Sequence, residues 1–538
     1  MHLRKHDLLQ MNDEWLKKLP AERLLEVSKR LLDDVKELHD RLNQNPDNSS
    51  RPPTSQAPWE RASDAEVGQD SPSETNPAEA DEGETETGEV REETAQSEEK
   101  SPSAPKAAKK KAGKQLGSPG FGRTQKLTVT ATCEHRPEHC AACALALAAD
   151  AKSEAYTGWD EIDLAPPVEG RIGLMFSVTR HLLLEVECTC GHVSRAQPWR
   201  APPNSQWEKV ELGEWRLVGP QLAGVLVFLG LRMRLSRARI REGLMELFGL
   251  MLSTGVIDET IREAGRASFP LADLLVADIV PAPQLNVDET SWKESGLRLW
   301  LWALVTTHTV LFLIGPRTAE MLENALQDGY HGILISDGYV VYRAWKNRLR
   351  CWPHLMRKLR GLAESTDRRV AGVGKEMEGL MQTLMDAIYA ARIDPPPEGL
   401  PVRYAVDLAR LRHLCEAHWM DAHPALRSVV REFLYDWEVI LRPVAEPPLP
   451  LSNNAAEQAL RHWVIARHIS HGTRSEAGSR AFALLASVIE TCRRRGASSW
   501  RYLGTVIAAA RKGLPLPPLP AIPAAASGGV NDYIPAAA

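Results

Sequence analysis

The segment that most constrains the fold of this chain is residues 283–337. Apolar and polar residues alternate in LNVDETSW, and two further strand-like runs, RLWLWALVTT and VLFLIG, follow at the spacing of β-hairpins. A helix-like segment, TAEMLENAL, comes next and is followed by a buried strand, GILISD. The predicted order is three strands, a helix and a strand, with a further helix behind them, which is the order of an RNase H-like α/β fold.

Two acids in these strands are expected to meet. Asp288 lies in the middle of the first strand and Asp337 ends the fourth, so this fold would place them side by side on neighbouring strands. Hard divalent ions such as Mg²⁺ or Mn²⁺ prefer carboxylate oxygens. Two such ions can stabilise the attacking and leaving oxygens when a phosphodiester is cut. We therefore expect a metal site here, and exposed acids at a sheet edge are the alternative.

A third acid comes from a helix far downstream. The run LSNNAAEQALRHWVIARHISHGTRS predicts a helix that begins after Asn453 and Asn454, since such residues often cap helices. Glu457 lies one turn inside that helix and is the candidate for the third metal-binding carboxylate. Residues 361–450 are rich in helical patterns and are predicted to form a helical insertion.

Basic side chains accompany these acids. The run CWPHLMRK follows Asp337, and its Cys351 and His354 have the spacing of metal ligands. Two ligands do not complete a metal site, so we favour packing beside the active site. Five basic residues are predicted to contact DNA phosphate: Arg357, Lys358, Arg461, Arg467 and Arg474.

Residues 214–268 contain a predicted helix-turn-helix. In LSRARIREGLMELFGLMLSTGVIDETIREA, Ser236 caps the first helix, Gly249 supplies the turn, and Ser253 or Thr254 caps the second helix. The residues expected to contact DNA are Ser253, Thr254 and Arg262. An ordinary helical hairpin is the alternative, and the second helix is not very basic.

Residues 129–200 are predicted to form a zinc-ribbon-like segment, because five of the eight cysteines fall within it. Thiolates suit zinc, a borderline-soft ion that needs four ligands. The predicted ligands of a structural zinc ion are Cys140, Cys143, Cys188 and Cys190. The second pair has one residue between its cysteines instead of two, so four further residues remain alternative ligands: Cys133, His139, His181 and His192. Reduced cysteines without metal are the other interpretation.

Residues 1–45 are predicted to form a helix that associates with a second copy. Leu24, Leu31 and Leu38 recur every seven residues, with Val35 and Leu42 at the alternate positions of a coiled-coil seam. An amphipathic helix packed on its own protein is the alternative interpretation.

Residues 46–128 are predicted to be a disordered linker that is first acidic and then basic. The basic part is a flexible arm on DNA phosphate or only a solvated linker. The chain has 65 basic and 70 acidic residues, and a net charge of -5 does not argue against nucleic acid, because the acidic tract conceals the basic excess elsewhere.

Neither a signal peptide nor a membrane span is predicted. The first residues contain no apolar segment, and the most apolar run, LAGVLVFLGLRMRL, is short and holds two arginines. We expect a cytoplasmic protein without membrane association that ends in a Pro/Ala-rich tail, residues 513–538.

Taken in order, these motifs resemble the transposases of insertion-sequence family sixty-six. The motifs that carry the resemblance are LNQNPDNSSRPPTS, RPEHCAAC, LFGLMLSTGVI, VDETSWK, SDGYVVY, CWPHLMRK and NNAAEQALRHWVIARHISHGTRSEAG. They cover nearly the whole chain apart from the acidic tract. The chain departs from the usual pattern at Ser452, where aspartate is common, and at His468, where lysine is usual.

The resemblance implies a DDE transposase whose triad is Asp288, Asp337 and Glu457. Such a protein would bind terminal inverted repeats and perform metal-dependent strand cleavage and transfer into target DNA. The implied setting is the bacterial nucleoid, as a homo-oligomer and together with accessory proteins of the same element. The alternatives are another RNase H-fold nuclease and a DNA-binding repressor with an inactive catalytic domain.

The expected architecture is therefore a multidomain α+β protein. The coiled-coil helix, the linker, the zinc-binding segment and the helix-turn-helix precede an RNase H-like catalytic domain. That domain is predicted to come in two parts, residues 280–360 and 451–512, on either side of the helical insertion.

Overall fold

The computed structural model describes residues 20–42, 125, 127–166, 173–201, 210–326 and 329–523. The chain divides into two units, residues 1–55 with 127–538 and residues 56–126, and all the described helices and strands belong to the first. Most of the predicted linker and the end of the predicted tail lie outside the described residues. Within the described ranges, no helix combines the length and the apolar composition needed to cross a membrane.

The N-terminal helix is confirmed over the residues described. Helix α3 (Ala21–Leu42) begins directly after Pro20, a residue that suits the start of a helix. Several of its apolar side chains are exposed, among them Leu32 at 54% and Val35 at 58%. Its self-association stays a prediction.

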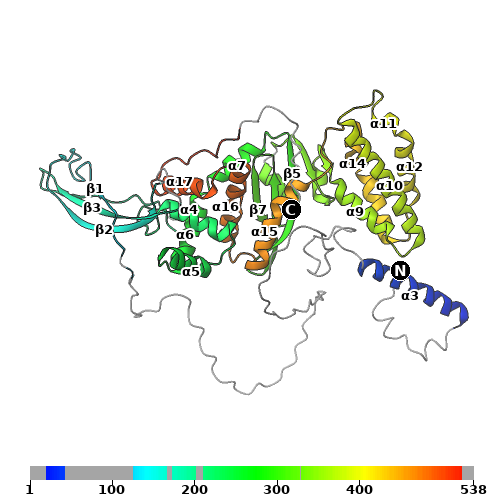
Figure 1. The fold of residues 1–538 in the computed structure, drawn as a ribbon, viewed down its shortest axis with the longest axis horizontal. Helices are drawn as coiled ribbons and strands as arrows, with labels where there is room; N and C mark the ends of the chain where they lie inside the picture. Colours follow the sequence, from blue (N-terminus) through cyan, green and yellow to red (C-terminus); the bar gives the residue numbers. More distant parts are fainter. Residues whose placement is uncertain are drawn as a thin grey trace, which may run out of the picture. The chain divides into compact units, whose positions relative to one another are not determined.

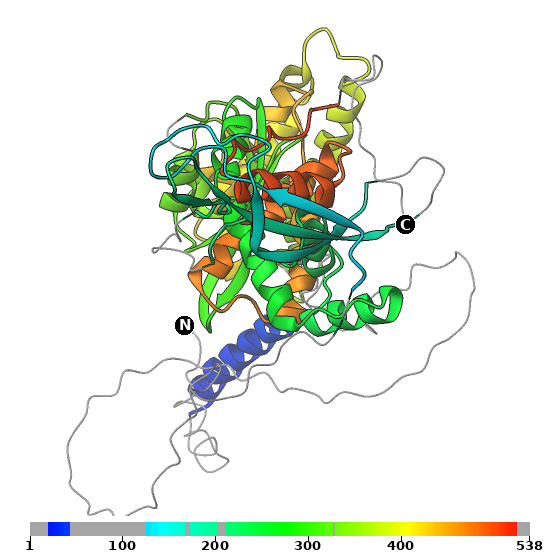
Figure 2. The ribbon, with the colours of Figure 1, turned by 90° about the vertical axis from the view of Figure 1, so that its left-hand side faces the viewer.

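The first sheet is formed by the cysteine-rich segment. Its strands are β1 (Ala131–His135), β2 (Ser153–Leu164), β3 (Phe176–Glu187) and β4 (Val193–Arg195). Strand β3 lies in the middle, parallel to β1 and antiparallel to β2 and β4 (Figure 1, Figure 2). At the end of β2, the Asp163 carboxylate accepts a hydrogen bond of 2.7 Å from the backbone N–H of Leu222, at the start of the next helix.

A group of helices connects this sheet to the second one. Their bounds are α4 (Pro220–Val227), α5 (Arg237–Phe248), α6 (Thr254–Ala267) and α7 (Leu271–Ile279), with a π-helical turn at Phe228–Arg232. The predicted caps are present: Ser236 and Ser253 each accept a backbone hydrogen bond at a helix start, and Gly249 ends α5 at a φ of 61°. The two helices predicted here are therefore confirmed as helices.

Helix α6 is largely buried in the main apolar core. Ile257 and Ala264 are fully buried within it. A Cβ atom on Gly265 would lie 2.4 Å from the Cβ atom of Ala481, so glycine allows α6 to approach a C-terminal helix closely. Much of this helix is thus part of the core that also covers the second sheet.

The second sheet has the strand order β7-β6-β5-β8-β9. The strands are β5 (Gln284–Glu294), β6 (Leu297–Val305), β7 (Val310–Gly315), β8 (Ile333–Ser336) and β9 (Arg348–Arg350), with α8 (Ala319–Leu326) between β7 and β8. Strands β5, β6 and β7 pair antiparallel, whereas β8 and β9 run parallel to β5. The predicted order of three strands, a helix and a strand is confirmed.

Three C-terminal helices complete this layer: α15 (Asn454–Ser470), α16 (Glu476–Arg494) and α17 (Ser499–Arg511). Helix α16 covers the edge strand β7, where the backbone N–H of Phe312 donates to Ser487 Oγ at 2.8 Å and that of Val310 donates to Thr491 Oγ1 at 3.0 Å. These hydroxyls satisfy a strand edge that would otherwise be open to pairing. Figure 1 shows α15, in orange, along the green strands.

The long segment between Cys351 and Leu451 is helical, as predicted, and has its own apolar core. Its helices are α9 (Trp352–Ala363), α10 (Arg368–Ala391), α11 (Leu400–Arg403), α12 (Ala405–Ala417), α13 (Pro424–Tyr435) and α14 (Trp437–Ala445). The insertion was predicted to begin at residue 361. Leu355 and Leu359 of α9 are buried in the core of the insertion, however, so the insertion begins near Trp352 by packing.

Candidate functional site

The register of the second sheet brings Asp288 and Asp337 to the same place. Strand β8 pairs with β5 in parallel, and the last paired residues are Asn286 and Ile335. Asp288 lies two residues beyond Asn286, and Asp337 lies two residues beyond Ile335. Because both advances are equal and the strands are parallel, the two acids lie opposite each other beyond the carboxyl end of β8.

Asp337 is held in a tight turn. Its Oδ1 atom accepts a hydrogen bond of 2.9 Å from the backbone N–H of Tyr339. Gly338 between them has a packing requirement, since a Cβ atom there would lie 2.5 Å both from Arg350 Nη2 and from Glu432 Oε1. The turn that carries Asp337 therefore rests directly on a buried ion pair.

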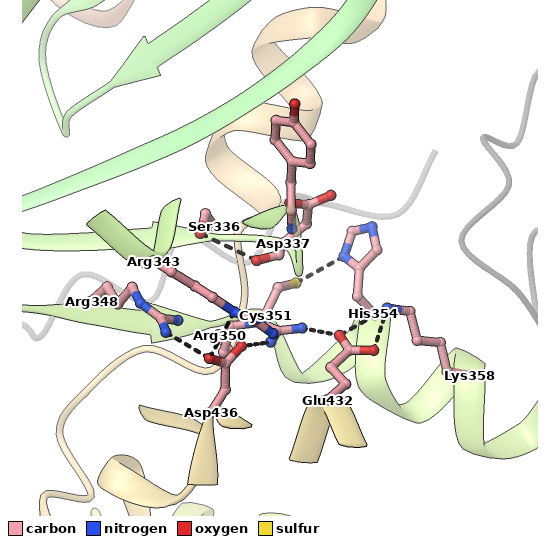
Figure 3. Close-up of polar contacts among 11 residues, drawn as sticks. Ser336, Asp337, Arg343, Arg348, Arg350, Cys351, His354, Lys358, Glu432 and Asp436 are labelled. Carbon is pink, nitrogen blue, oxygen red and sulfur yellow. Dashed lines mark hydrogen bonds and ion pairs between the residues drawn. The ribbon is translucent and has the colours of Figure 1, made fainter. Parts of the chain in front are cut away.

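That ion pair belongs to a cluster that joins β9 to the helical insertion (Figure 3). Arg350, with 1% of its side chain exposed, is paired with both Asp436 and Glu432. Arg348 Nη2 lies 2.6 Å from Asp436 Oδ1, and Lys358 Nζ lies 2.8 Å from Glu432 Oε2. Burial opposes ionisation of Asp436, but the hydrogen bond and charge of Arg348 outweigh it and lower the pKa of this carboxyl group.

The start of α15 is bonded to the strand that carries Asp288. Asn453 is fully buried, and its Nδ2 donates to the carbonyl oxygen of Val287 at 2.8 Å while its Oδ1 accepts from Asn286 Nδ2 at 3.0 Å. Asn453 is the N-cap residue of α15, as predicted, but its side chain makes no capping hydrogen bond to the described backbone of the helix. The buried amide is engaged by the strand instead, one residue before Asp288.

The rest of α15 follows the same strand. Arg467 Nη1 donates to Thr290 Oγ1 and to Ser291 Oγ, both at 2.9 Å. After the helix, the backbone N–H of Thr473 donates to the carbonyl oxygen of Lys293 at 2.9 Å. The helix that carries Glu457 is thus attached to β5 at its start, along its length and just beyond its end.

Electrostatics indicates that the three predicted acids converge. Burial raises the pKa of Asp288 well above its ordinary value, and the charges of Asp337, Glu289 and Glu457 raise it further. Burial and Asp337 raise the pKa of Glu457, whereas Arg357 opposes the shift. Asp337 thus contributes to the raised pKa of both Asp288 and Glu457, and a divalent cation would offset this repulsion.

Glu289 is a buried acid that the sequence analysis missed. Its side chain is 1% exposed, and its Oε1 lies 2.8 Å from Arg317 Nε, while the hydroxyl of Tyr342 donates to Oε2. Arg317 in turn stacks on the ring of Tyr339, in the turn that holds Asp337. The only sequence signal was a second acid directly after Asp288 in VDETSW.

Cys351 and His354 lie beside Glu457, in agreement with the predicted packing role. His354 Nδ1 is 3.4 Å from Glu457 Oε1 and 3.2 Å from Cys351 Sγ. Burial raises the pKa of the Cys351 thiol to about 12 and lowers the pKa of His354 to about 3. These three residues are close enough to share a metal ion. A protonated thiol is a poor ligand, however, so the pair is better suited to positioning Glu457.

The remaining predicted DNA contacts differ in their surroundings. Arg461 and Arg474 are exposed, on α15 and just after it. Arg357 Nη2 lies 4.0 Å from Glu457 Oε1. On α6, Thr254 and Arg262 are exposed. Ser253 serves as the helix cap, and two acids share the exposed side of this helix, Asp258 paired with Arg237 and Glu259 paired with Arg216.

The four predicted zinc ligands meet on the first sheet. Cys140 Sγ lies 3.7 Å from Cys190 Sγ, and Cys143 Sγ lies 3.6 Å from Cys188 Sγ. In a tetrahedral site with Zn–S bonds of about 2.3 Å, sulfur atoms are about 3.8 Å apart. The backbone N–H of Cys143 lowers the pKa of the Cys140 thiol to about 5, whereas the backbone N–H of Leu145 is outweighed at Cys143, where the neighbouring Cys140 and Cys190 raise the pKa of the thiol to about 12. Zinc binding would deprotonate the crowded thiols together. These four cysteines can hold a structural zinc ion without any of the alternative ligands.

Comparison with known proteins adds the following similarities. Residues 216–481 match the family model described as Transposase IS66 family, a range that runs from the segment before α4 into α16 and contains all three acids. Three uncharacterized proteins of Sinorhizobium fredii also resemble the chain. The protein y4jO is 31% identical over 180 residues, which are 32% of this chain and 54% of that protein.

The other two relatives are more distant. The protein y4hP is 25% identical over 335 residues, or 54% of this chain and 59% of its own length. The protein y4qI is 22% identical over 312 residues, or 50% of this chain and 55% of its own length. The matches thus span a little over half the length of each of these relatives.

Proposed function

Residues 216–481 place this chain in the IS66 transposase family, and from that premise we propose that it is a DNA transposase with Asp288, Asp337 and Glu457 as its metal-binding triad. The observation that carries the proposal is the attachment of α15 to β5 through Asn453, beside the parallel pairing of β5 with β8. Together these contacts support a site shared by three carboxylates, which come from β5, the turn after β8 and α15.

The topology of the second sheet supports an RNase H-like catalytic domain. In the strand order β7-β6-β5-β8-β9, the first strand in sequence is central, the next two extend one side as hairpins, and the fourth joins its other side in parallel. An acid in the first strand and an acid after the fourth are then neighbours. The helical insertion interrupts this domain between β9 and α15.

The carboxylates fit Mg²⁺ or Mn²⁺. All three offer hard oxygen ligands, and the raised pKa of Asp288 reflects its burial and then the repulsion of nearby acids, both of which a divalent cation would offset. When bound, such ions activate a nucleophilic water or 3′-hydroxyl and stabilise the leaving oxygen of a phosphodiester. Asp288 is held by a sheet, Asp337 by its turn and Glu457 by His354, so the chain presents the ligands from rigid elements.

A basic hollow beside Asp337 suits the DNA backbone. It has a volume of about 550 Å³ and reaches Gly338, the residue after Asp337. Its lining includes four cationic side chains: Arg343, Lys358, Arg427 and Arg431. Cationic side chains bind phosphate irrespective of base sequence. We assign this surface, with the exposed Arg461 and Arg474, to the DNA strand that enters the site.

The accessory parts serve assembly on DNA. The four cysteines would bind a structural Zn²⁺ ion that folds the segment before the helices. The exposed apolar side chains of α3 support a homo-oligomer, which would bring two terminal inverted repeats together. The predicted basic arm would add contacts to phosphate that depend on salt.

The first prediction tests the triad. Asp337→Asn should retain binding of DNA that carries the terminal inverted repeats, but lose Mg²⁺-dependent cleavage and strand transfer. A metal site contributes several kcal/mol to such a reaction, so the loss should be on the order of 10³-fold or more. The measurement is a cleavage assay beside a gel-shift assay on the same DNA.

The matched control is Asp394→Asn, an exposed acid after α10, which should leave both activities unchanged. Cleavage by Asp337→Asn at the wild-type rate would reject the triad. Binding without any cleavage by the unaltered protein, across Mg²⁺ and Mn²⁺ concentrations, would favour a repressor instead.

A further inference from the structure

A second group of metal-binding side chains lies on the first sheet, apart from the four cysteines. Cys133 of β1 pairs in register with His181 of β3, and His181 pairs in turn with Trp159 of β2. Directly paired residues point to the same face of a sheet, as do residues two apart in one strand. Cys133, His135, His181 and Trp159 therefore share one face.

The ligand atoms of the two histidines and the cysteine converge. His135 Nε2 lies 2.8 Å from His181 Nδ1. One ligand atom from each of Cys133, His135 and His181 lies within 4.8 Å of the other two. In a tetrahedral zinc site with one sulfur and two nitrogen ligands, these atoms are about 3.3–3.6 Å apart. Side-chain movements of about 1 Å would therefore suffice to close the site.

The surroundings hold both imidazoles in place. The ring of Trp159 stacks on the rings of His181 and His135, with centroid distances of 4.4 Å and 5.4 Å. The ring of Trp215 also stacks on that of Trp159, at 5.8 Å. His181 Nε2 is buried and makes no hydrogen bond to any residue that the structure describes. The contact with His135 runs through the other ring nitrogen, Nδ1, and this is the atom that would bind a cation.

The short contact between the two imidazoles fits a bound cation. Without a metal, the two ring nitrogens that face each other, His135 Nε2 and His181 Nδ1, share a single proton in one hydrogen bond. A cation would satisfy both, and would bring in the cysteine sulfur as a third ligand.

The site is separate from the four-cysteine site. Cys188 comes seven positions after His181, directly beyond the end of β3. A strand rises about 3.3 Å per residue, so the two positions are roughly 23 Å apart. One ion cannot serve both groups, and the two sites can be emptied separately.

We propose that Cys133, His135 and His181 form a second metal site, which binds a borderline-soft divalent cation of the Zn²⁺ class. One thiolate and two imidazoles are ligands typical of zinc. Three protein ligands leave a fourth position for water or another small ligand, whereas the four-cysteine site is closed. The two ions would thus differ in accessibility as well as in ligands.

The experiment measures metal in the full chain. Zinc per chain is determined by mass spectrometry after dialysis, in an Asp337→Asn background so that the carboxylate site adds little. We expect two equivalents in this background, one after Cys133→Ser and one after Cys140→Ser combined with Cys143→Ser. The control Asp150→Asn alters an exposed acid of the same segment that belongs to neither group, and it should retain two equivalents.

Cobalt substitution distinguishes loss of the site from loss of the fold. Cys133→Ser should remove only the weaker thiolate-to-cobalt absorption of a one-sulfur site and preserve the spectrum of the four-sulfur site. His135→Gln, which keeps the thiol, should shift or remove the same band. One equivalent of zinc in the background protein, with cobalt spectra unchanged by both variants, would overturn the proposal. Neither readout depends on DNA cleavage.

Discussion

Asn453 shows at the scale of a single residue how the site is assembled. Its amide uses both its donor and its acceptor on β5, at Val287 and Asn286, although its position in the chain is that of a helix cap. Its backbone N–H is 3.3 Å from Cys351 Sγ. One buried residue, through its side chain and its backbone, thus connects the helix of Glu457, the strand of Asp288 and the residue that leads into the insertion.

The second prediction concerns this amide. Asn453→Ala leaves the buried carbonyl oxygen of Val287 without its donor, which costs about 1–3 kcal/mol in the free energy of unfolding. Because Glu457 also loses its attachment to β5, Mg²⁺-dependent cleavage should fall by more than about tenfold, the equivalent of 1.4 kcal/mol. DNA binding should persist. Urea unfolding and cleavage kinetics provide the two measurements.

Asn454→Ala is the matched control, since Asn454 is adjacent and exposed. It should change the free energy of unfolding by less than about 0.5 kcal/mol. Equal effects of the two substitutions would contradict the role assigned to Asn453.

The third prediction concerns pH. Burial raises the pKa of Glu161 on β2 to about 7, although Arg511 opposes the shift. The folded state therefore holds this proton more tightly than the unfolded state does. Stability is lost as pH rises from the ordinary carboxyl value to about 7. Each pKa unit is worth about 1.4 kcal/mol, so the loss at pH 8 is at most about 3 kcal/mol.

Glu161→Gln removes this ionisation. It should raise the free energy of unfolding at pH 8 and leave it nearly unchanged at pH 4, as measured by urea titration at both values. Glu154→Gln on the same strand is the control, because Glu154 is 67% exposed. A stabilisation of the same size at both pH values would show that ionisation is not the cause.

Elements defined by local signals could be predicted from the sequence. The caps at Ser236 and Ser253, and the glycine that ends α5, follow from residue types within one turn of a helix. Strands β5 to β8 follow from alternation, and the equal advance of Asp288 and Asp337 beyond paired residues follows from their order. The sequence therefore contained most of the catalytic sheet.

Contacts between distant segments could not be predicted in the same way. Arg467 looked like a phosphate contact because it is a cation in a basic helix, yet it donates to Thr290 and Ser291. The grouping of Cys133 with His181 depends on a parallel pairing that no local pattern reveals. Most of helix α9 was predicted to belong to the RNase H-like domain, but it packs in the core of the insertion. An apolar helix face does not by itself show which of two cores it joins.

The fourth prediction concerns the attachment of the insertion to β9. Arg350→Met leaves Asp436 and Glu432 buried with less compensating charge, which costs about 3–5 kcal/mol in the free energy of unfolding. Because Gly338 packs on this pair, the Asp337 turn should also move, and Mg²⁺-dependent cleavage should fall. Urea unfolding and the cleavage assay measure the two effects.

Arg360→Met is the control for this substitution. Arg360 is 48% exposed and pairs with Glu378 on the surface of the insertion, so its loss should cost less than about 1 kcal/mol. If Arg350→Met were equally mild, the buried cluster would not be what holds the insertion.

At the scale of the whole molecule, the catalytic core includes more than the catalytic strands. The main apolar core extends from Ile162 of the first sheet through α4 and α6 to α17. Arg511 of α17 forms a buried ion pair with Glu263 of α6, at 2.9 Å. The helices predicted to bind DNA are therefore built into the same body as the three proposed metal-binding acids.

The fifth prediction concerns assembly. Val35 is 58% exposed on α3, at a position of the predicted seam. Val35→Glu should shift the full chain toward monomer in sedimentation velocity, because a charge at a seam position opposes association. The control is Lys29→Glu, at an exposed position outside the seam, which should leave the distribution unchanged. Identical sedimentation of the unaltered protein and Val35→Glu would reject the coiled coil.

The two ends of the helical insertion meet in a single hydrogen bond, from the backbone N–H of Trp352 to the carbonyl oxygen of Leu451, 2.8 Å long. The ends of this segment of about a hundred residues are therefore as close together as the ends of a short loop. Closure entropy grows only slowly with the length of a loop. A change in the number of residues between these two ends would therefore leave the spacing of Asp288, Asp337 and Glu457 largely unaltered.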